Sequence, residues 1–257
     1  MENKGKLYSS YFKFSQTVGW QNALCLCKFV VDYYEKTGLS FDCKPCYVEI
    51  NTSLDAPHYI NSAKQSSGHH IELTVSHFNL WNQMLFQLAH EITHCFIFCN
   101  NQSVAHSISW VEETVCEAMS LFFLKLSSQN WSRLPLYKIN PKYARQFITP
   151  YLENEIEKDA GADKLGSCAS YDELLHIEMT SQSNREYRHE ETVKLYELIK
   201  KNDIEGLIKY RDYALANKKL LNTAAYRMAF PDNDAVSYLC ALQDSIMTRE
   251  AGGKKTG

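Results

Sequence analysis

The chain has 257 residues, of which 45% are hydrophobic and 22% are charged, and its formal net charge is −3. This composition is typical of a globular protein, excludes collagen-like and low-complexity classes, and argues against a nucleic-acid binder that depends on a basic surface. The sequence contains no run of 18 apolar residues, so it predicts neither a transmembrane helix nor a membrane partner.

The cysteines and the first residues of the chain indicate a compartment. The number of cysteines, nine, is odd, and a chain of this length can fold without disulfide cross-links. Residues 1–8 lack the apolar core of a secretory signal. We therefore expect a reduced, cytoplasmic protein, whereas the sequence predicts no oligomeric state.

The first half of the chain combines short strands with long helices. Alternating apolar residues predict strands over 8–14, 47–51 and 70–75, with a polar, turn-rich stretch at 53–68. Apolar residues at helical spacing predict helices over 19–36, 79–99 and about 107–126.

The second half is predicted to be helical and more charged. Its helices fall near 141–158, 171–179, 186–201, 203–216 and 233–247. Because strands disappear near residue 130, we predict a core over 1–130, a helical subdomain over 131–248 that closes a cleft, and a flexible tail over 249–257. The predicted fold class is α+β, with a small antiparallel sheet in the core.

The strongest chemical signal is the segment His90-Glu91-Ile92-Thr93-His94. Two histidines at i and i+4 lie one turn apart on one helix face, so both imidazoles can reach a single Zn²⁺ ion. The glutamate directly after the first histidine can address a metal-bound water. The pair also lies opposite the predicted apolar stripe of its helix, as residues that line a cleft would.

A second segment strengthens this interpretation. Trp110 and Glu113 follow the motif, and eighteen residues separate His94 from Glu113. Over about residues 70–124 the sequence resembles the gluzincin metallopeptidases, the superfamily of thermolysin and the M1-type aminopeptidases. Their pattern HExxH-x18-E, with a Trp three residues before the Glu, implies a zincin-like fold in which Glu113 is the third zinc ligand. The resemblance also implies that Glu117, one turn later, supports a ligand histidine.

The sequence departs from the aminopeptidases at two places. Thr114 and Val115 stand where aminopeptidases commonly have Gly-Phe, and the Gly-rich exopeptidase signature upstream is replaced by residues 70–75. Aminopeptidase specificity therefore does not transfer, and the choice between endo- and exopeptidase stays open.

The resemblance implies zinc-dependent hydrolysis of a peptide or protein substrate. His90, His94 and Glu113 would hold one Zn²⁺ ion, and Glu91 would be the general base. We expect strand 70–75 to offer its edge to an extended peptide. The alternatives are a non-catalytic zinc-binding module that recognises a peptide or protein on the same scaffold, and a helical structural protein with a chance motif.

Gluzincins usually place a Tyr or His beyond the third ligand to stabilise the oxyanion. The helical half offers four candidates for this role, which are His176, Tyr187, His189 and Tyr226. The pair His189-Glu190 is not a second zinc motif, because Val193 stands at the place of the second histidine.

The remaining metal-type residues have weaker patterns. Cys43 and Cys46, with Cys25 and Cys27, have the composition of a second zinc site, but Cys25 and Cys27 fall on different sides of a predicted helix. Two further pairs have ordinary structural interpretations: Cys95 and Cys99 are predicted to pack in the core, and His69 and His70 to lie in a loop, with metal ligation as the alternative for the two histidines.

Overall fold

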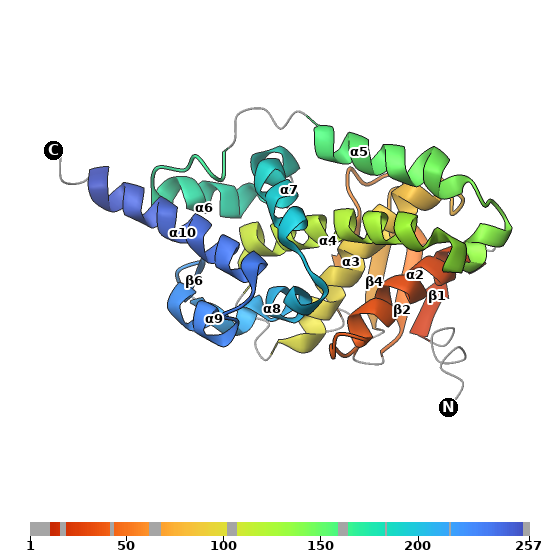
Figure 1. The fold of residues 1–257 in the computed structure, drawn as a ribbon, viewed down its shortest axis with the longest axis horizontal. Coiled ribbons are helices and arrows are strands. Elements are labelled where there is room, and N and C mark those ends of the chain that lie inside the picture. Colours follow the sequence, from red (N-terminus) through yellow and green to blue (C-terminus); the bar gives the residue numbers. More distant parts are fainter. Residues whose placement is uncertain are drawn as a thin grey trace. The chain divides into compact units, whose positions relative to one another are not determined.

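A computed structural model describes residues 11–15, 19–41, 44–61, 68–101, 107–158, 164–182, 184–215 and 217–253 (Figure 1). The chain divides into two compact units that alternate along the sequence: the first comprises Met1–Cys99 and Met119–Glu157, and the second comprises Asn100–Ala118 and Lys158–Gly257. Helix α4 (Ser109–Asn130) contributes to both. The division near residue 130 that the sequence predicts stays a prediction.

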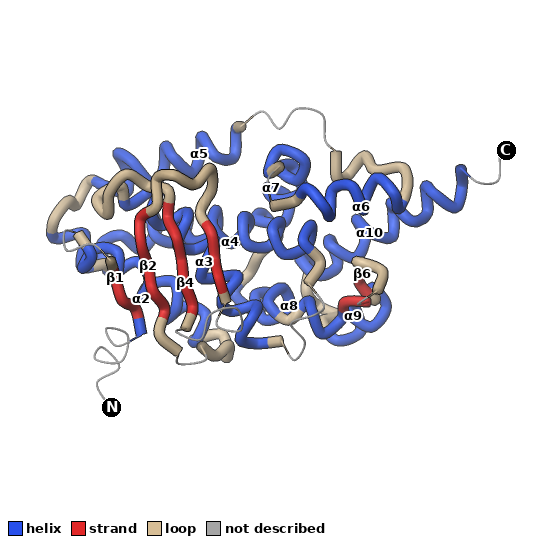
Figure 2. Tube along the Cα trace, turned by 180° about the vertical axis from the view of Figure 1, so that it is seen from behind, coloured by secondary structure: helices blue, strands red, loops and turns tan. Residues whose placement is uncertain are grey.

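The first unit is built on a four-stranded sheet, which is drawn in red in Figure 2. Its strand order is β1 (Phe12–Phe14), β2 (Cys46–Ile50), β4 (His69–Leu73) and β3 (His58–Ile60). Strands β1, β2 and β4 are parallel, and β3 runs antiparallel to β4. The α+β class is confirmed, but the prediction of an antiparallel sheet is wrong. A helix between β1 and β2 allows the crossover that parallel strands require.

Strand β3, and not β4, is the edge strand on this side of the sheet. It lies inside the stretch predicted to be turns, and its three residues are too few to show alternation. Strand β4 pairs with β2 on one side and with β3 on the other. The prediction that this strand offers a free edge to a peptide is therefore wrong, and β3 forms that edge of the sheet.

The first unit also contains helices, of which two lie on one face of the sheet. Its helices are α2 (Trp20–Glu35), α3 (Trp81–Asn100), the second part of α4 and α5 (Thr149–Glu157), with a π-helical turn at Ala144–Ile148. In β2 and β4, buried and half-buried residues alternate. Figures 1 and 2 show α2 and α3 on the same side of the strands, so the buried side chains of the sheet face these helices.

Helix α3, which carries the motif residues 90–94, is fixed against α2 by buried contacts. The Tyr34 ring on α2 stacks on Phe96 with centroids 4.4 Å apart. The Tyr34 hydroxyl lies 2.5 Å from the Thr93 hydroxyl, which also bonds the Ala89 carbonyl at 2.6 Å. Thr93 lies inside the motif, so these contacts define the rotation of the motif about the helix axis.

Gly68 allows β4 to begin beside the backbone of Pro45. Its φ angle is 129°, and a Cβ at this position would lie 2.3 Å from the Pro45 carbonyl oxygen. The next residue, His69, donates its N–H to the same oxygen at 2.8 Å. We expect Gly68→Ala to lower the free energy of unfolding by about 1–3 kcal/mol in urea denaturation. Gly38 is the control, because its φ is 89° but nothing lies within 4 Å of a Cβ there. Equal losses in Gly38→Ala and Gly68→Ala would show that the approach to Pro45 costs nothing.

The second unit is mainly helical. Besides the first part of α4 it contains α6 (Tyr171–Thr180), α7 (His189–Leu198), α8 (Ile204–Ile208), α9 (Thr223–Ala229), α10 (Asp234–Gly253) and a hairpin of β5 (Ala214–Leu215) and β6 (Leu220–Leu221). The predicted helix over 203–216 is too long, because the chain after Ile208 enters a short 3-10 turn and then the hairpin. Helix α9 was not predicted, although Asn222 caps it by accepting the Ala225 N–H at 3.2 Å.

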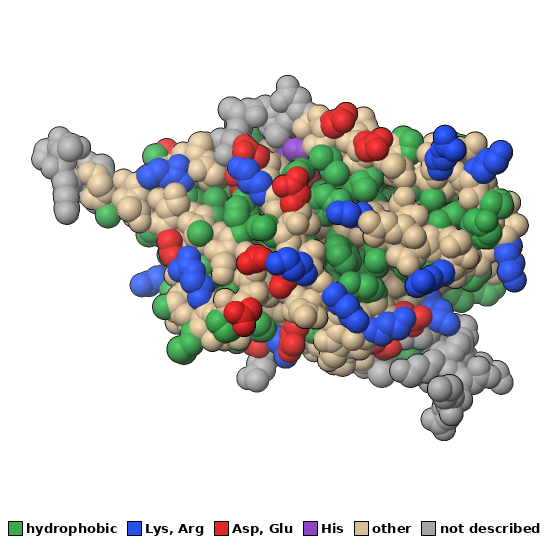
Figure 3. Space-filling model, in the orientation of Figure 1, with side chains coloured by type: hydrophobic (Ala, Val, Ile, Leu, Met, Phe, Trp, Pro, Cys, Tyr) green, Lys and Arg blue, Asp and Glu red, His purple; other side chains and the backbone are tan. Residues whose placement is uncertain are grey.

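The surface carries both signs of charge. On the face drawn in Figure 3, Lys and Arg side chains lie among Asp, Glu and apolar side chains, in keeping with the small net charge. Among the described residues, every helix is too short or too polar to cross a bilayer.

Candidate metal sites

The two motif histidines converge on α3. The Nε2 atoms of His90 and His94 lie 3.2 Å apart, and the ring planes meet at 65°. Two nitrogens bound to one zinc ion at about 2.0–2.1 Å in tetrahedral geometry would be about 3.3 Å apart. The observed separation therefore fits two ligands of one ion.

The surroundings of this pair are more enclosed than the sequence indicates. His90 and Glu91 are only 3% and 2% exposed, and His94 is half-buried. The Glu91 Oε1 atom is buried and has no hydrogen-bond partner among the described residues. A buried carboxylate oxygen without a partner is costly, and a catalytic role or a bound ion is one of the explanations for such an atom. The residues present therefore fit a metal centre with an adjacent base.

The acidic residues of α4 lie in the part of the helix that belongs to the second unit. Glu113 is nearly buried, and its role as third ligand stays a prediction. Glu117 forms an ion pair with Arg188, with Oε2 and Nη1 separated by 3.7 Å. Its predicted support of a ligand histidine also stays a prediction. The Arg188 side chain is fully buried, and its Nη2 also donates to the Ser181 carbonyl at 2.8 Å.

Glu112 has a structural function. Its carboxylate accepts hydrogen bonds from Arg211 Nη2 at 2.8 and 2.6 Å and from Arg211 Nε at 3.0 Å. The Tyr210 hydroxyl donates to the same carboxylate. Although burial lowers the pKa of Arg211, the negative charge of Glu112 raises it above its ordinary value. This network ties the beginning of α4 to the segment after α8.

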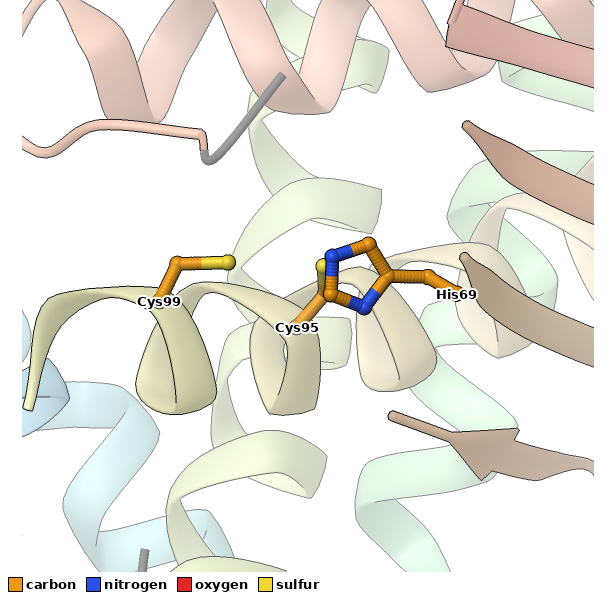
Figure 4. A group of neighbouring side chains, drawn as sticks. All are labelled: His69, Cys95 and Cys99. Atoms are coloured by element: carbon orange, nitrogen blue, oxygen red, sulfur yellow. The ribbon is translucent and has the colours of Figure 1, made fainter. Parts of the chain in front are cut away.

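A second group of metal-type side chains lies within the first unit. His69, Cys95 and Cys99 each offer a ligand atom, and these three atoms lie within 4.8 Å of one another. Figure 4 shows the imidazole and both sulfur atoms directed toward a common region. The prediction that His69 and His70 lie in a loop is wrong, because both belong to β4, and for His70 the predicted strand over 70–75 holds instead. Cys95 is buried, as a packing residue would be, but its neighbours are potential ligands.

Tyr59 on the edge strand β3 connects the two histidine groups. Its hydroxyl lies 2.8 Å from His69 Nδ1. Its ring lies parallel to the ring of His94, with centroids 6.3 Å apart. Burial, and then the neighbouring thiols of Cys95 and Cys99, raise the pKa of Tyr59. Burial and contact with Cys99 likewise raise the pKa of Cys95, so this thiol is protonated in the absence of a cation.

The four oxyanion candidates all belong to the second unit. Tyr226 is fully buried and donates its hydroxyl to the Gly206 carbonyl at 2.8 Å, as a packing tyrosine does. His176 and Tyr187 line a pocket of about 480 Å³ within the second unit. The approach of any candidate to the motif histidines stays a prediction. Of the proposed cysteine site, Cys43 lies outside the described residues.

One signal for the missed group was present in the sequence. Cys95 and Cys99 repeat, on the same helix, the i, i+4 spacing of His90 and His94. This spacing does not identify the third ligand. His69 lies on β4, and it comes close to Cys95 only because the sheet packs on α3.

Comparisons of the chain with models of protein families, with curated proteins and with solved structures found no match. The motif residues and the geometry of the two sites are therefore the evidence for a function.

Proposed function

We propose that the protein is a zinc-dependent metallopeptidase in which His90, His94 and Glu113 hold one Zn²⁺ ion and Glu91 is the general base. Two observations carry this proposal. The two Nε2 atoms lie 3.2 Å apart, and the adjacent buried Glu91 has an oxygen with no hydrogen-bond partner among the described residues.

The chemistry divides between the ion and the chain. When bound, zinc would polarise the scissile carbonyl and make a water molecule more acidic. The Glu91 carboxylate would accept a proton from that water and transfer it to the leaving amine. The contacts of Thr93 with Tyr34 and Ala89 hold the motif helix in one orientation. The positions of Glu91 and the two histidines should therefore change little when a substrate binds.

The edge strand β3 supports a peptide as the substrate. It pairs with β4 on one side, and its residue Tyr59 lies beside His94. An extended peptide added to the outer edge of β3 would therefore run near the metal-binding face of α3. In this proposal the peptide pairs with β3, and not with residues 70–75 as the sequence predicted.

A non-catalytic zinc-binding module on the same scaffold is the alternative proposal. Such a module needs metal ligands but no base. The burial of Glu91, with an oxygen that no described residue bonds, favours catalysis, because a binding module gains nothing from this cost.

Removal of the metal tests the proposal. We expect the purified protein to contain zinc and to cleave members of a broad peptide library, and a chelator to abolish cleavage until zinc is restored. His94→Ala should lose one zinc equivalent and all cleavage, as measured by elemental analysis and mass spectrometry. His77→Ala is the control, because His77 is exposed and lies outside both metal groups. Cleavage that survives removal of all zinc would contradict the proposal.

A further inference from the structure

We propose that His69, Cys95 and Cys99 form a second metal site, which binds zinc in a structural role and is independent of the His90–His94 site. Cysteine thiolates with an imidazole are the ligand set of structural zinc sites. The site would join strand β4 to helix α3, the helix that carries the zinc motif.

The distances fit a metal after a small adjustment. In a tetrahedral zinc site, sulfur ligands at about 2.3 Å and nitrogen ligands at about 2.0–2.1 Å lie about 3.3–3.8 Å from one another. The three ligand atoms here lie within 4.8 Å, so they need to approach by about 1 Å or less. Cys99 is half-buried in the last turn of α3, where a change of side-chain rotamer can provide this movement.

Tyr59 orients the histidine. Its hydroxyl forms a hydrogen bond of 2.8 Å with Nδ1 of His69. Nε2 is therefore the nitrogen that would bind the metal. A hydrogen bond to the second nitrogen of a ligand imidazole fixes the tautomer and the direction of the ring. The Tyr59 and His69 rings also stack with centroids 5.8 Å apart, which limits rotation of the imidazole. Tyr59 is therefore a positioning residue of this site.

Cys46 is the candidate for a fourth ligand. It is the register partner of His69 on the adjacent parallel strand, and both residues are fully buried. Register partners project from the same face of a sheet, so Cys46 and His69 both face α3. Four protein ligands would complete the closed coordination that is typical of a structural zinc ion.

Cobalt substitution separates this site from the His90–His94 site. Co²⁺ bound to thiolate gives sulfur-to-cobalt charge-transfer absorption, whereas a site of imidazole and carboxylate ligands does not. We expect the full chain, stripped of metal and loaded with Co²⁺, to bind two equivalents and to show this absorption. His94→Ala should lose one equivalent and keep the absorption. Cys99→Ser should lose the absorption and the other equivalent.

Two further variants complete the test. Cys25→Ser is the control, because Cys25 is a half-buried cysteine on α2 outside the group, and it should keep the absorption. Tyr59→Phe should weaken Co²⁺ binding at the thiolate site about 10–100-fold. Two results would overturn the proposal: cobalt that binds the wild-type protein without charge-transfer absorption, or absorption in Cys99→Ser equal to that of the wild type.

Discussion

Replacement of Glu91 by Gln is expected to abolish nearly all peptide hydrolysis while zinc stays bound. The amide has the shape of the carboxylate but cannot accept a proton from water, and it leaves both imidazoles in place. A general base contributes about 10²–10⁴-fold to the rate of a reaction, so kcat should fall by a factor of at least about 10². Zinc content from elemental analysis and kcat on one cleaved peptide provide the two measurements.

A second glutamate-to-glutamine variant provides the control. Glu49 lies on β2, half-buried and outside both metal groups, so Glu49→Gln should keep both zinc and activity. If wild type and Glu91→Gln had equal activity, Glu91 would not be the base, and the non-catalytic zinc-binding module would become the better explanation of the motif.

Replacement of Arg211 by Met is expected to cause a large loss of stability. Arg211 and Glu112 are both nearly buried, and the guanidinium provides most of the hydrogen bonds to the carboxylate. Removal of one partner leaves a buried charge uncompensated, which typically costs about 3–5 kcal/mol. A shift of the urea midpoint without a change of slope would measure this loss.

An exposed pair provides the matched control for Arg211. Arg227 contacts Asp244 at 2.6 Å, but their side chains are 38% and 42% exposed. Arg227→Met should therefore change stability by no more than about 1 kcal/mol. The double variant Glu112→Met/Arg211→Met should recover much of the loss, because it leaves no buried charge. If Arg211→Met and Arg227→Met were equally stable, the network would not hold the beginning of α4.

The elements that local pattern determines were predictable from the sequence. Helices α2 and α3 have apolar residues at helical spacing along their whole length, and both appear near the predicted bounds. The order and direction of the strands were not predictable, because they depend on pairing between distant segments. Strand β3 illustrates the limit: its three residues have no distinctive pattern, yet their pairing with β4 determines which strand forms the edge.

The candidate sites divide in the same way. The convergence of His90 and His94 follows from their spacing on one helix. That spacing can be read directly from the sequence, so this pair was predictable. The group of His69, Cys95 and Cys99 depends on a sheet that brings β4 to α3, so the sequence supplies only the cysteine spacing. Tyr210 and Arg211, which bond the Glu112 carboxylate, are separated from it by almost 100 residues, and no local pattern connects them.

Anomalous diffraction at the zinc absorption edge, from crystals of the zinc-loaded full chain, tests the central claim most directly. We expect a peak about 2.0–2.1 Å from Nε2 of both His90 and His94, with a Glu113 oxygen as a further ligand. A separate peak at His69, Cys95 and Cys99 would be assigned to the structural site and would not count toward this result. A fully zinc-loaded crystal with no peak between His90 and His94 would contradict the proposal of a catalytic zinc ion.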